Sequence, residues 1–456
     1  MNDSPELDGP ARGRGIDRSA PVQRALVIHP VRADQSARRD PQPRLDEAVG
    51  LAEALDLMVV GAELANVRRP MPATLFGKGK VEEIRALAEE LRCDLVVVDD
   101  SLSPVQQRNL EKAWNAKVVD RTGLILEIFS RRARTAEGKL QVELARLDYE
   151  RSRLVRTWTH LERQRGGMSK TGGPGETQIE LDRRLIADRI VKLKLQLEEV
   201  RRTRALHRSA RKRTPFPMIA LVGYTNAGKS TLFNRLTGGG VLAKDMLFAT
   251  LDTTQRSLGL PDGRPAILSD TVGFISDLPH ELVAAFRATL EEVKEADVIL
   301  HVRDLSTEDS EAQASDVKSV LKQIDITSDS DARLIEVWNK VDLVPSEDRM
   351  VLEARARRRS ETGEGPAALT VSAVTGEGCA ALLQRLAAMV DTAPPLDVLL
   401  PINDGRALAW LYQNGRVMDR VDQDDGGARL AVRLDDQALG RFERLFPEAQ
   451  LKAAAE

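Results

Sequence analysis

Apolar and polar positions along residues 24–120 predict strands and helices in turn. Short apolar runs bounded by polar residues predict strands at 24–30, 57–64, 94–100 and 116–120. Between these runs, apolar residues at helical spacing predict helices at 45–55, 79–91 and 103–114. Ser103 directly precedes Pro104 and is expected to cap the third helix. Strands that alternate with helices are typical of a small α/β domain with a mostly parallel sheet.

A seven-residue apolar repeat follows this domain. Its positions are Leu140, Leu144, Leu147, Leu154, Trp158 and Leu161 in the first half, and Ile179, Ile186, Ile190, Leu193, Leu197 and Val200 in the second. Charged residues fill most positions between them, which predicts two long helices paired as an antiparallel coiled-coil hairpin. Thr177 and Glu180 have the spacing of a capping box and predict the start of the second helix.

The glycine-rich segment RGGMSKTGGPGETQ, residues 165–178, lies between the two halves of this repeat. It looks like a phosphate-binding loop. Such a loop follows an apolar strand, whereas here the charged helical end HLERQR comes first. We therefore expect the segment to be the tip of the hairpin and not a nucleotide site.

A second glycine-rich segment does have the required context. Residues 218–222 predict an apolar strand, residues 223–230 match the pattern G-x-x-x-x-G-K-S, and STLFNRL then begins a helix. In such a loop the backbone N–H groups and the helix N-terminus face phosphate. Lys229 can neutralise the β- and γ-oxygens, and the Ser230 hydroxyl can bind Mg²⁺.

Three further strand ends indicate which nucleotide binds. The run AILSDTVG places Asp270 to hold Mg²⁺ through water and the Gly273 N–H near the γ-phosphate. After LIEVWN, the Asp342 carboxylate can accept hydrogen bonds from guanine N1–H and the exocyclic amine, a pair that adenine does not offer. In ALTVSAVTG, the backbone of Ser372 and Ala373 can contact guanine O6. Four motifs at the carboxyl ends of strands predict GTP binding by a doubly wound sheet.

Composition places the chain among soluble globular proteins. Of its 456 residues 42% are hydrophobic, and no apolar run approaches the ~20 residues of a membrane span. Residues 1–22 lack apolar periodicity and are expected to be a disordered tail. Cys93 and Cys379 are far apart, and no secretory leader is visible, which indicates a reducing cytoplasm. His29 lies on an apolar strand and is expected to be a core histidine rather than a metal ligand.

The net charge of −3 conceals a basic segment at 121–215, where Lys and Arg outnumber Asp and Glu roughly two to one. The exterior of a coiled coil is usually charged, so a solvated helical face is one interpretation of this excess. Neutralisation of nucleic-acid phosphates is the other.

The GTP-binding motifs resemble those of the translation-factor-related GTPases. The resemblance implies that the segment before Asp270 contains the first switch and that Thr250 binds Mg²⁺ when GTP is present. Many small GTPases have, after the D-x-x-G glycine, a glutamine that orients the attacking water, but Phe274 stands here. We therefore expect slow intrinsic hydrolysis. Asn226 matches the asparagine of GTPases that use K⁺, and a loop-stabilising side chain is the alternative.

The chain as a whole resembles the HflX family of bacterial GTPases. The resemblance is carried by MPATLFGKGKVEEI (71–84), DRTGLILEIFSRRARTAEGKLQVELARL (120–147), GPGETQIELDRR (173–184), GYTNAGKS (223–230), FATLD (248–252) and DTVGF (270–274). It implies binding to the large (50S) ribosomal subunit, with a role in splitting stalled or idle ribosomes under stress. The hairpin tip, with Arg165, Lys170 and Gln178, is then expected to reach ribosomal RNA. Lys78 and Lys80 either contact RNA as well or belong to a turn that begins a helix.

The predicted fold class is therefore α/β and multidomain. The segments are a disordered tail (1–22), an N-terminal α/β domain (23–134), a long antiparallel helical hairpin (135–213) with its tip at 166–175, a central P-loop GTPase domain with a doubly wound sheet (214–393) and a small C-terminal α+β domain (394–448). In the last of these the order predicted is a strand, a helix at 404–415, a second strand, an Asp-Asp-Gly-Gly turn, a third strand at 428–434 and a last helix.

The candidate site residues fall into three groups. Lys229, Thr250 and Gly273 are the catalytic candidates, and Ser230 and Thr250 are the metal ligands. The nucleotide-binding candidates are Gly223, Tyr224, Thr225, Asn226, Ala227, Gly228, Lys229, Ser230, Phe248, Ala249, Thr250, Leu251, Asp252, Asp270, Thr271, Val272, Gly273, Asn339, Lys340, Val341, Asp342, Ser372, Ala373 and Val374. The expected ligands are Mg²⁺ and GTP or GDP, with K⁺ as an open candidate.

The leading hypothesis is a monomeric cytoplasmic GTPase that works as a switch on the large ribosomal subunit, in splitting or in ribosome biogenesis, with peripheral membrane association left open. One alternative is a regulatory GTPase that acts on a protein or membrane-associated complex through the basic hairpin. Another is a passive RNA-binding module whose nucleotide site serves only stability.

Overall fold

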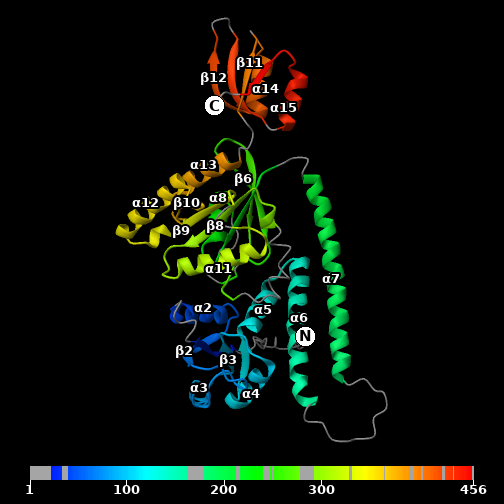
Figure 1. Ribbon diagram of the computed structural model, residues 1–456, viewed down its shortest axis with the longest axis vertical. Coiled ribbons are helices and arrows are strands. Elements are labelled where there is room, and N and C mark those ends of the chain that lie inside the picture. The colour runs from blue at the N-terminus through cyan, green and yellow to red at the C-terminus, as the bar shows by residue number, and fades with distance from the viewer. Residues whose placement is uncertain are drawn as a thin grey trace, which may run out of the picture. The chain divides into compact units, whose positions relative to one another are not determined.

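The computed structural model of the chain describes residues 22–32, 40–162, 178–211, 216–239, 247–248, 250–277, 292–327, 331–363, 365–390, 395–401, 404–423, 427–434 and 436–453. Contacts divide the chain into two compact units, residues 1–128 with 150–176 and residues 129–149 with 177–456. Figure 1 labels the helices and strands along the chain. Among the described residues, no helix combines the length and apolarity that crossing a membrane would require.

The N-terminal part of the chain forms the predicted parallel sheet. Its strands are β1 (Arg24–Arg32), β2 (Met58–Val67), β3 (Leu95–Val98) and β4 (Lys117–Asp120), in the order β2-β1-β3-β4. The predicted helices are α2 (Pro41–Glu53), α3 (Lys78–Glu90) and α4 (Pro104–Trp114). Ser103 caps α4 in a capping box with Gln106, because the side chain of each residue bonds the backbone N–H of the other. The prediction of four strands and three helices is confirmed.

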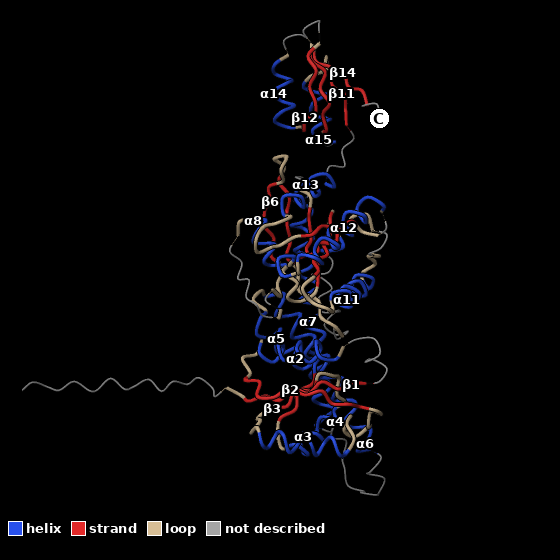
Figure 2. Tube along the Cα trace, turned by 90° about the vertical axis from the view of Figure 1, so that its left-hand side faces the viewer, coloured by secondary structure: helices blue, strands red, loops and turns tan. Residues whose placement is uncertain are grey.

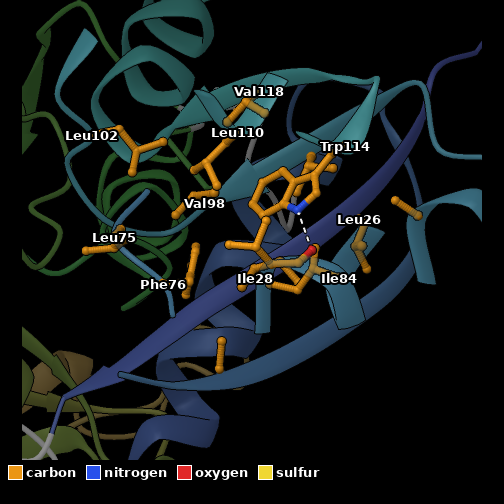
Figure 3. Close-up of a cluster of buried hydrophobic side chains, with 14 of the residues drawn as sticks. Leu26, Ile28, Leu75, Phe76, Ile84, Val98, Leu102, Leu110, Trp114 and Val118 are labelled. Carbon is orange, nitrogen blue, oxygen red and sulfur yellow. Dashed lines mark hydrogen bonds between the residues drawn. The ribbon is translucent and has the colours of Figure 1, made fainter. Parts of the chain in front are cut away.

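Apolar side chains of the strands and of α3 and α4 pack into one core (Figure 3). Trp114 is its largest fully buried side chain, and its indole Nε1 donates to the Val81 carbonyl at 3.0 Å. That bond satisfies the polar atom of an otherwise apolar ring. His29 is buried with Nδ1 2.7 Å from an Asp99 carboxylate oxygen, so it is a satisfied core histidine as expected.

Two long helices follow α5 (Arg121–Arg132): α6 (Ala136–Glu162) and α7 (Gln178–Arg211). On α7 the repeat positions Ile190, Leu193 and Leu197 are buried, as predicted. Among the α6 side chains that the structure describes, residues 136–153, the most deeply buried apolar ones are Val142 and Ala145, which are not repeat positions.

The repeat leucines of α6, Leu140, Leu144 and Leu147, are only half-buried. The buried positions Gln141, Val142 and Ala145 are offset from this predicted seam by one or two residues. Arg189 of α7 pairs with Glu143 of α6 at 2.8 Å. The glycine tip at 165–177, which includes the predicted capping residue Thr177, lies outside the described residues. The side chains of four repeat positions are also outside the described part: Leu154, Trp158, Leu161 and Ile179.

The central sheet carries the GTP motifs. Its strands are β5 (Met218–Gly223), β6 (Thr254–Gly259), β7 (Pro265–Asp270), β8 (Val298–Asp304), β9 (Leu334–Asn339) and β10 (Ala367–Thr370), in the order β10-β9-β8-β5-β7-β6. Of its strands only β6 is antiparallel, at the edge beside β7, and the short turn Pro261-Asp262-Gly263 between the two strands is one that predicts such a pairing. The helices around it are α8 (Lys229–Thr237), α11 (Ser310–Gln323), α12 (Ser346–Thr362) and α13 (Cys379–Val390) (Figure 1).

The C-terminal residues form an antiparallel sheet with two helices (Figure 2). The elements are β11 (Pro395–Leu400), α14 (Gly405–Asn414), β12 (Arg416–Asp422), β13 (Ala428–Arg433), α15 (Asp436–Leu445) and β14 (Gln450–Ala453), and the sheet order is β12-β13-β11-β14. Strand β14 was not predicted. It pairs with β11 and lies after the last predicted helix.

Candidate nucleotide and magnesium site

The phosphate-binding loop joins β5 to α8, and its two glycines occupy positions that no side chain could fill. Gly228 has φ +90°, and a Cβ there would lie 2.2 Å from Nδ2 of Asn339. A Cβ at Gly223 would lie 2.2 Å from the Val302 carbonyl oxygen. The spacing of glycines in the motif therefore reflects close approach of β8 and β9 to the loop, as well as room for phosphate.

Lys229 begins α8 and is almost fully buried. Its Nζ donates to the carbonyls of Gly223 and Tyr224, at 3.1 and 2.7 Å, so the ammonium is directed into the loop. Burial lowers the pKa of Lys229 to about 8, and the negative charge of Asp270 opposes that shift. Because the charge of Asp270 offsets only part of the cost of burying the ammonium group, an anionic ligand near Lys229 is favoured.

Three side chains from separate elements meet at the end of β7. The hydroxyls of Ser230 and Thr250 donate to Oδ2 of Asp270 at 2.7 and 3.1 Å, and lie 2.9 Å from each other. The other Asp270 oxygen, Oδ1, is buried without a hydrogen-bond partner in the described part of the chain. Burial raises the pKa of Asp270, against the opposite effects of the Ser230 bond, the Lys229 charge and the Thr250 bond.

This cluster fits a hard divalent cation. Mg²⁺ prefers oxygen ligands and is usually held by one or two protein groups together with phosphate oxygens and water. Two hydroxyl oxygens and a carboxylate with an orphaned buried oxygen supply that donor set. The cation would also stabilise the charged form of Asp270, whose burial otherwise disfavours it.

Phe274 is tied to the phosphate-binding loop through its backbone. The Phe274 N–H donates to the Gly223 carbonyl at 3.0 Å, and the Phe274 carbonyl accepts from the Thr225 N–H at 2.7 Å. Its side chain is only 3% exposed. The ring is therefore part of the packed interior, and cannot orient a water by hydrogen bonding. Gly273 next to it is constrained, because a Cβ there would lie 3.0 Å from Lys229 Nζ.

Asn339 at the end of β9 connects the phosphate-binding loop to the loop after β10. Its Nδ2 donates to the Ala227 carbonyl at 2.8 Å, and its Oδ1 accepts from the Ala373 N–H at 3.0 Å. Asp342 lies three residues further on and is exposed, so its carboxylate is available to a ligand. These contacts place three of the sequence motifs around one end of the sheet.

Arg235 of α8 was not predicted as a site residue. Its guanidinium donates from Nε to the Ala373 carbonyl at 3.1 Å and from Nη2 to the Val374 carbonyl. It therefore braces the loop expected to contact guanine. No sequence motif marks this arginine, although its place in the last turn of the helix that follows the phosphate-binding loop could have suggested a contact near the site.

The residues around Thr250 have varied surroundings. Phe248 and Leu251 are buried, and Phe248 packs against Phe129 at a ring-centroid distance of 4.7 Å. Asp252 accepts hydrogen bonds from Arg134 and Thr135. Of this group, the structure brings only Thr250 to the Ser230 and Asp270 cluster, and Ala249 lies outside the described residues.

The remaining candidates line the same end of the sheet or support it. Thr271 donates to the Leu221 carbonyl at 2.6 Å, and Lys340 pairs with Asp304 at 2.7 Å. The Thr225 hydroxyl is buried without a partner among the described residues, whereas Asn226 is exposed with φ +60°. The other members are Tyr224, Val272, Val341, Ser372 and Val374, of which only Val374 is exposed.

The sheet and its loops define a P-loop GTPase, and four family models of GTPases match successive parts of the chain. The models are "GTP-binding GTPase N-terminal" (42–130), "GTP-binding GTPase Middle Region" (132–211), "50S ribosome-binding GTPase" (218–340) and "HflX C-terminal domain" (357–456). The first two of them cover residues outside the phosphate-binding domain, so the match is to a multidomain GTPase.

Whole-chain relatives identify the family. GTPase HflX of Magnetococcus marinus is 53% identical over 88% of this chain and 90% of its own length. GTPase HflX of Escherichia coli is 41% identical over 92% of this chain and 95% of its own length. Among solved structures, SsGBP in complex with GDP is 24% identical, covers 81% of this chain and 98% of that chain, and has a TM-score of 0.47. The chain belongs to the HflX family of GTPases.

Proposed function

We propose that this GTPase binds the large ribosomal subunit and uses its GTP state as a switch in splitting stalled or idle ribosomes. The observation that carries the proposal is the burial of Phe274 at a position where other GTPases have a water-orienting glutamine. A site with the phosphate-binding parts but an apolar group at this position favours GTP binding over rapid turnover. Such a GTPase stays in its GTP state until a partner supplies the missing assistance.

Within that site the residues have separate roles. Lys229 and the loop N–H groups bind the phosphates, and Asp342 and the Ala373 backbone select guanine. Ser230 and Thr250 hold Mg²⁺, with Asp270 behind them. Bound Mg²⁺ would neutralise the charge that develops on the phosphate oxygens. The Gly273 N–H, next to Lys229, faces the γ-phosphate and so links hydrolysis to the conformation of residues 270–274.

The large ribosomal subunit is the partner that the charge distribution and the matched family model support. Among the side chains of α7 that the structure describes, exposed basic residues outnumber exposed acidic ones; the basic residues include Arg183, Lys192, Lys194 and Arg202. A basic helical surface of this kind can neutralise RNA phosphates and release their counterions. The family model for 218–340 is described as a ribosome-binding GTPase of the 50S subunit.

The test compares GTP hydrolysis with and without purified large subunits, at low and moderate salt. The proposal expects slow turnover alone, strong stimulation by large subunits, and stimulation that weakens as salt increases. A chain in which Lys192 and Lys194 are both replaced by Gln should lose stimulation and keep its basal turnover. Replacement of Glu198 and Glu199 on the same helix by Gln is the matched control, because it removes acidic groups and should not weaken binding.

Subunit splitting is measured separately, by light scattering of 70S particles after addition of the protein with GTP or with a non-hydrolysable analogue. The proposal expects loss of scattering with both nucleotides and none with GDP. Stimulation without splitting would contradict the splitting role while leaving ribosome binding intact. Absence of stimulation at any salt would contradict the ribosome as the partner.

A further inference from the structure

Thr250 lies between two residues that contact the segment leading into α6. Phe248, two residues before it, packs edge-on against Phe129, with an interplanar angle of 87°. Asp252, two residues after it, accepts from the backbone N–H groups of Arg134 and Thr135 at 2.9 and 3.0 Å. It also accepts from the Thr135 hydroxyl at 2.5 Å. The segment that carries the proposed magnesium ligand is therefore attached on both sides to residues 129–135.

The bonds to Asp252 lie at the N-terminus of α6, which begins at Ala136. The first N–H groups of a helix have no partner within the helix, and a carboxylate there is favoured both by hydrogen bonding and by the helix dipole. Thr135 itself accepts from the Gly138 N–H at 2.9 Å, so it is the local cap. Asp252, 117 residues further along the chain, completes that cap by binding the capping residue.

Gly138 provides room for this contact. A Cβ at Gly138 would lie 2.4 Å from Oδ1 of Asp252 and 3.0 Å from the Thr135 hydroxyl. Glycine within a helix costs about 1 kcal/mol relative to alanine in helix propensity. The first turn of α6 has a helix-weakening residue at the place where the carboxylate approaches.

We infer that Asp252 is a positioning residue for GTP hydrolysis, holding Thr250 at the magnesium site by anchoring its segment to the first turn of α6. The relationship works in both directions, because coupling between two equilibria is reciprocal. Binding of a ligand that orders Thr250 stabilises the first turn of α6. Conversely, loss of that turn weakens the binding of any ligand that requires an ordered Thr250. The inference rests on the proposed role of Thr250 in the GTP state, and it adds a mechanical connection from the nucleotide to the start of α6.

The first experiment measures affinity for a non-hydrolysable GTP analogue and for GDP, both with Mg²⁺, in the full chain. Asp252→Ala should weaken analogue binding three- to tenfold, the size of effect that follows loss of a helix cap, and leave GDP binding unchanged. Asp252→Asn keeps one acceptor oxygen and should restore part of the loss. Equal weakening of both nucleotides would show a merely structural role and would overturn the inference.

Two further variants distinguish loss of the contact between Asp252 and the first turn of α6 from loss of the Asp252 side chain itself. Gly138→Ala removes no hydrogen-bonding group and favours the helix, but displaces the Asp252 carboxylate. It should reproduce the nucleotide selectivity of Asp252→Ala with a smaller fall in the denaturation midpoint, because the gain in helix propensity offsets part of the lost cap. Asp404→Ala is the matched control, because Asp404 caps α14 through the Ala407 N–H and has no part in the nucleotide site. Unchanged selectivity in Gly138→Ala would contradict the inference.

The reciprocal effect is read by hydrogen exchange at the amides of residues 134–139. The GTP analogue should slow their exchange in the native chain relative to GDP, and Asp252→Ala should abolish the difference. Thr250→Ala serves to separate the two proposals. If Thr250→Ala leaves the preference for analogue over GDP unchanged, the role of Thr250 fails; if it removes the preference while Asp252→Ala does not, only the anchoring role fails.

Discussion

The backbone N–H of Phe274 donates to the carbonyl of Gly223 at 3.0 Å, which joins the end of the D-x-x-G motif to the start of the phosphate-binding loop. The Phe274 carbonyl returns a second bond to the N–H of Thr225. Both partners lie in the loop that holds phosphate. The position of residue 274 is consequently set by backbone hydrogen bonds, and at this position its side chain is buried.

Phe274→Gln should not create a faster GTPase. The carboxamide would be placed in a packed interior, where an unsatisfied polar group costs about 1–3 kcal/mol. We expect a lower denaturation midpoint and unchanged single-turnover GTP hydrolysis in the absence of ribosomes. Phe274→Leu is the control for lost volume without added polarity. A tenfold or greater rise in intrinsic turnover for the Gln variant would contradict this explanation of slow hydrolysis.

Asp342→Asn should narrow the preference for guanine over hypoxanthine. The carboxylate can accept from both guanine N1–H and the exocyclic amine, whereas hypoxanthine has no such amine. An asparagine at this position has a single acceptor oxygen, so the amine should no longer add affinity. We expect GTP binding to weaken ten- to a hundredfold, and ITP binding to fall less, when both are measured by competition with a fluorescent nucleotide.

Asp348→Asn, an exposed position in the first turn of α12, is the control for loss of one negative charge. It should bind both nucleotides like the native chain. Equal losses of GTP and ITP affinity in Asp342→Asn would show that the carboxylate does not recognise the exocyclic amine.

Arg235→Lys should weaken GTP and GDP binding by similar factors of about five to ten. Lysine keeps the charge but cannot reproduce two donors in fixed geometry to adjacent carbonyls. The loop at 372–374 would lose its brace, and the guanine contact is common to both nucleotides. Isothermal titration with each nucleotide measures the effect. Selective loss of GTP alone would indicate that Arg235 acts on the γ-phosphate side rather than on the base.

His301 should make the chain less stable as pH falls from neutral. Burial lowers its pKa from 6.5 to about 3, with Arg303, Lys318 and Lys229 adding to the shift and Glu336 opposing it. Between these two values the unfolded chain binds a proton at His301 that the folded chain does not. The contribution of His301 to stability is complete above pH 6.5. As the pH decreases below 6.5, the free energy of unfolding falls by up to about 1.4 kcal/mol per pH unit.

The measurement is the urea midpoint at about pH 7.5 and about pH 5.5, for the native chain and for His301→Leu. The leucine variant lacks the titrating group, so its midpoint should change less between the two conditions. Ser319→Ala, an exposed change on α11, is a control for substitution itself and should retain the native pH dependence. An identical pH dependence in the native and leucine chains would show that His301 does not titrate in this range.

The sequence by itself determined the elements of the nucleotide site, because each motif is local. Gly223 to Ser230 run from the last residue of an apolar strand into the first turn of a helix, and Asp270, Asn339 and Ser372 lie at or just beyond the ends of predicted strands. Parallel strands bring their carboxyl ends to one edge of a sheet, so the common direction of these strands was enough to predict that these residues lie at that edge. The antiparallel edge strand β6 was also predictable from local sequence, because only a short turn separates it from its partner β7.

Only the tertiary structure decided which faces of distant elements meet. The contacts of Asp252 with Thr135 and of Phe248 with Phe129 join segments more than a hundred residues apart, and no local pattern specifies them. The burial of Val142 and Ala145 was not predicted, because the heptad pattern records the spacing of apolar residues and not which elements pack on each face of a helix. Periodicity along a chain specifies elements, whereas the packing free energy of the folded chain selects their partners.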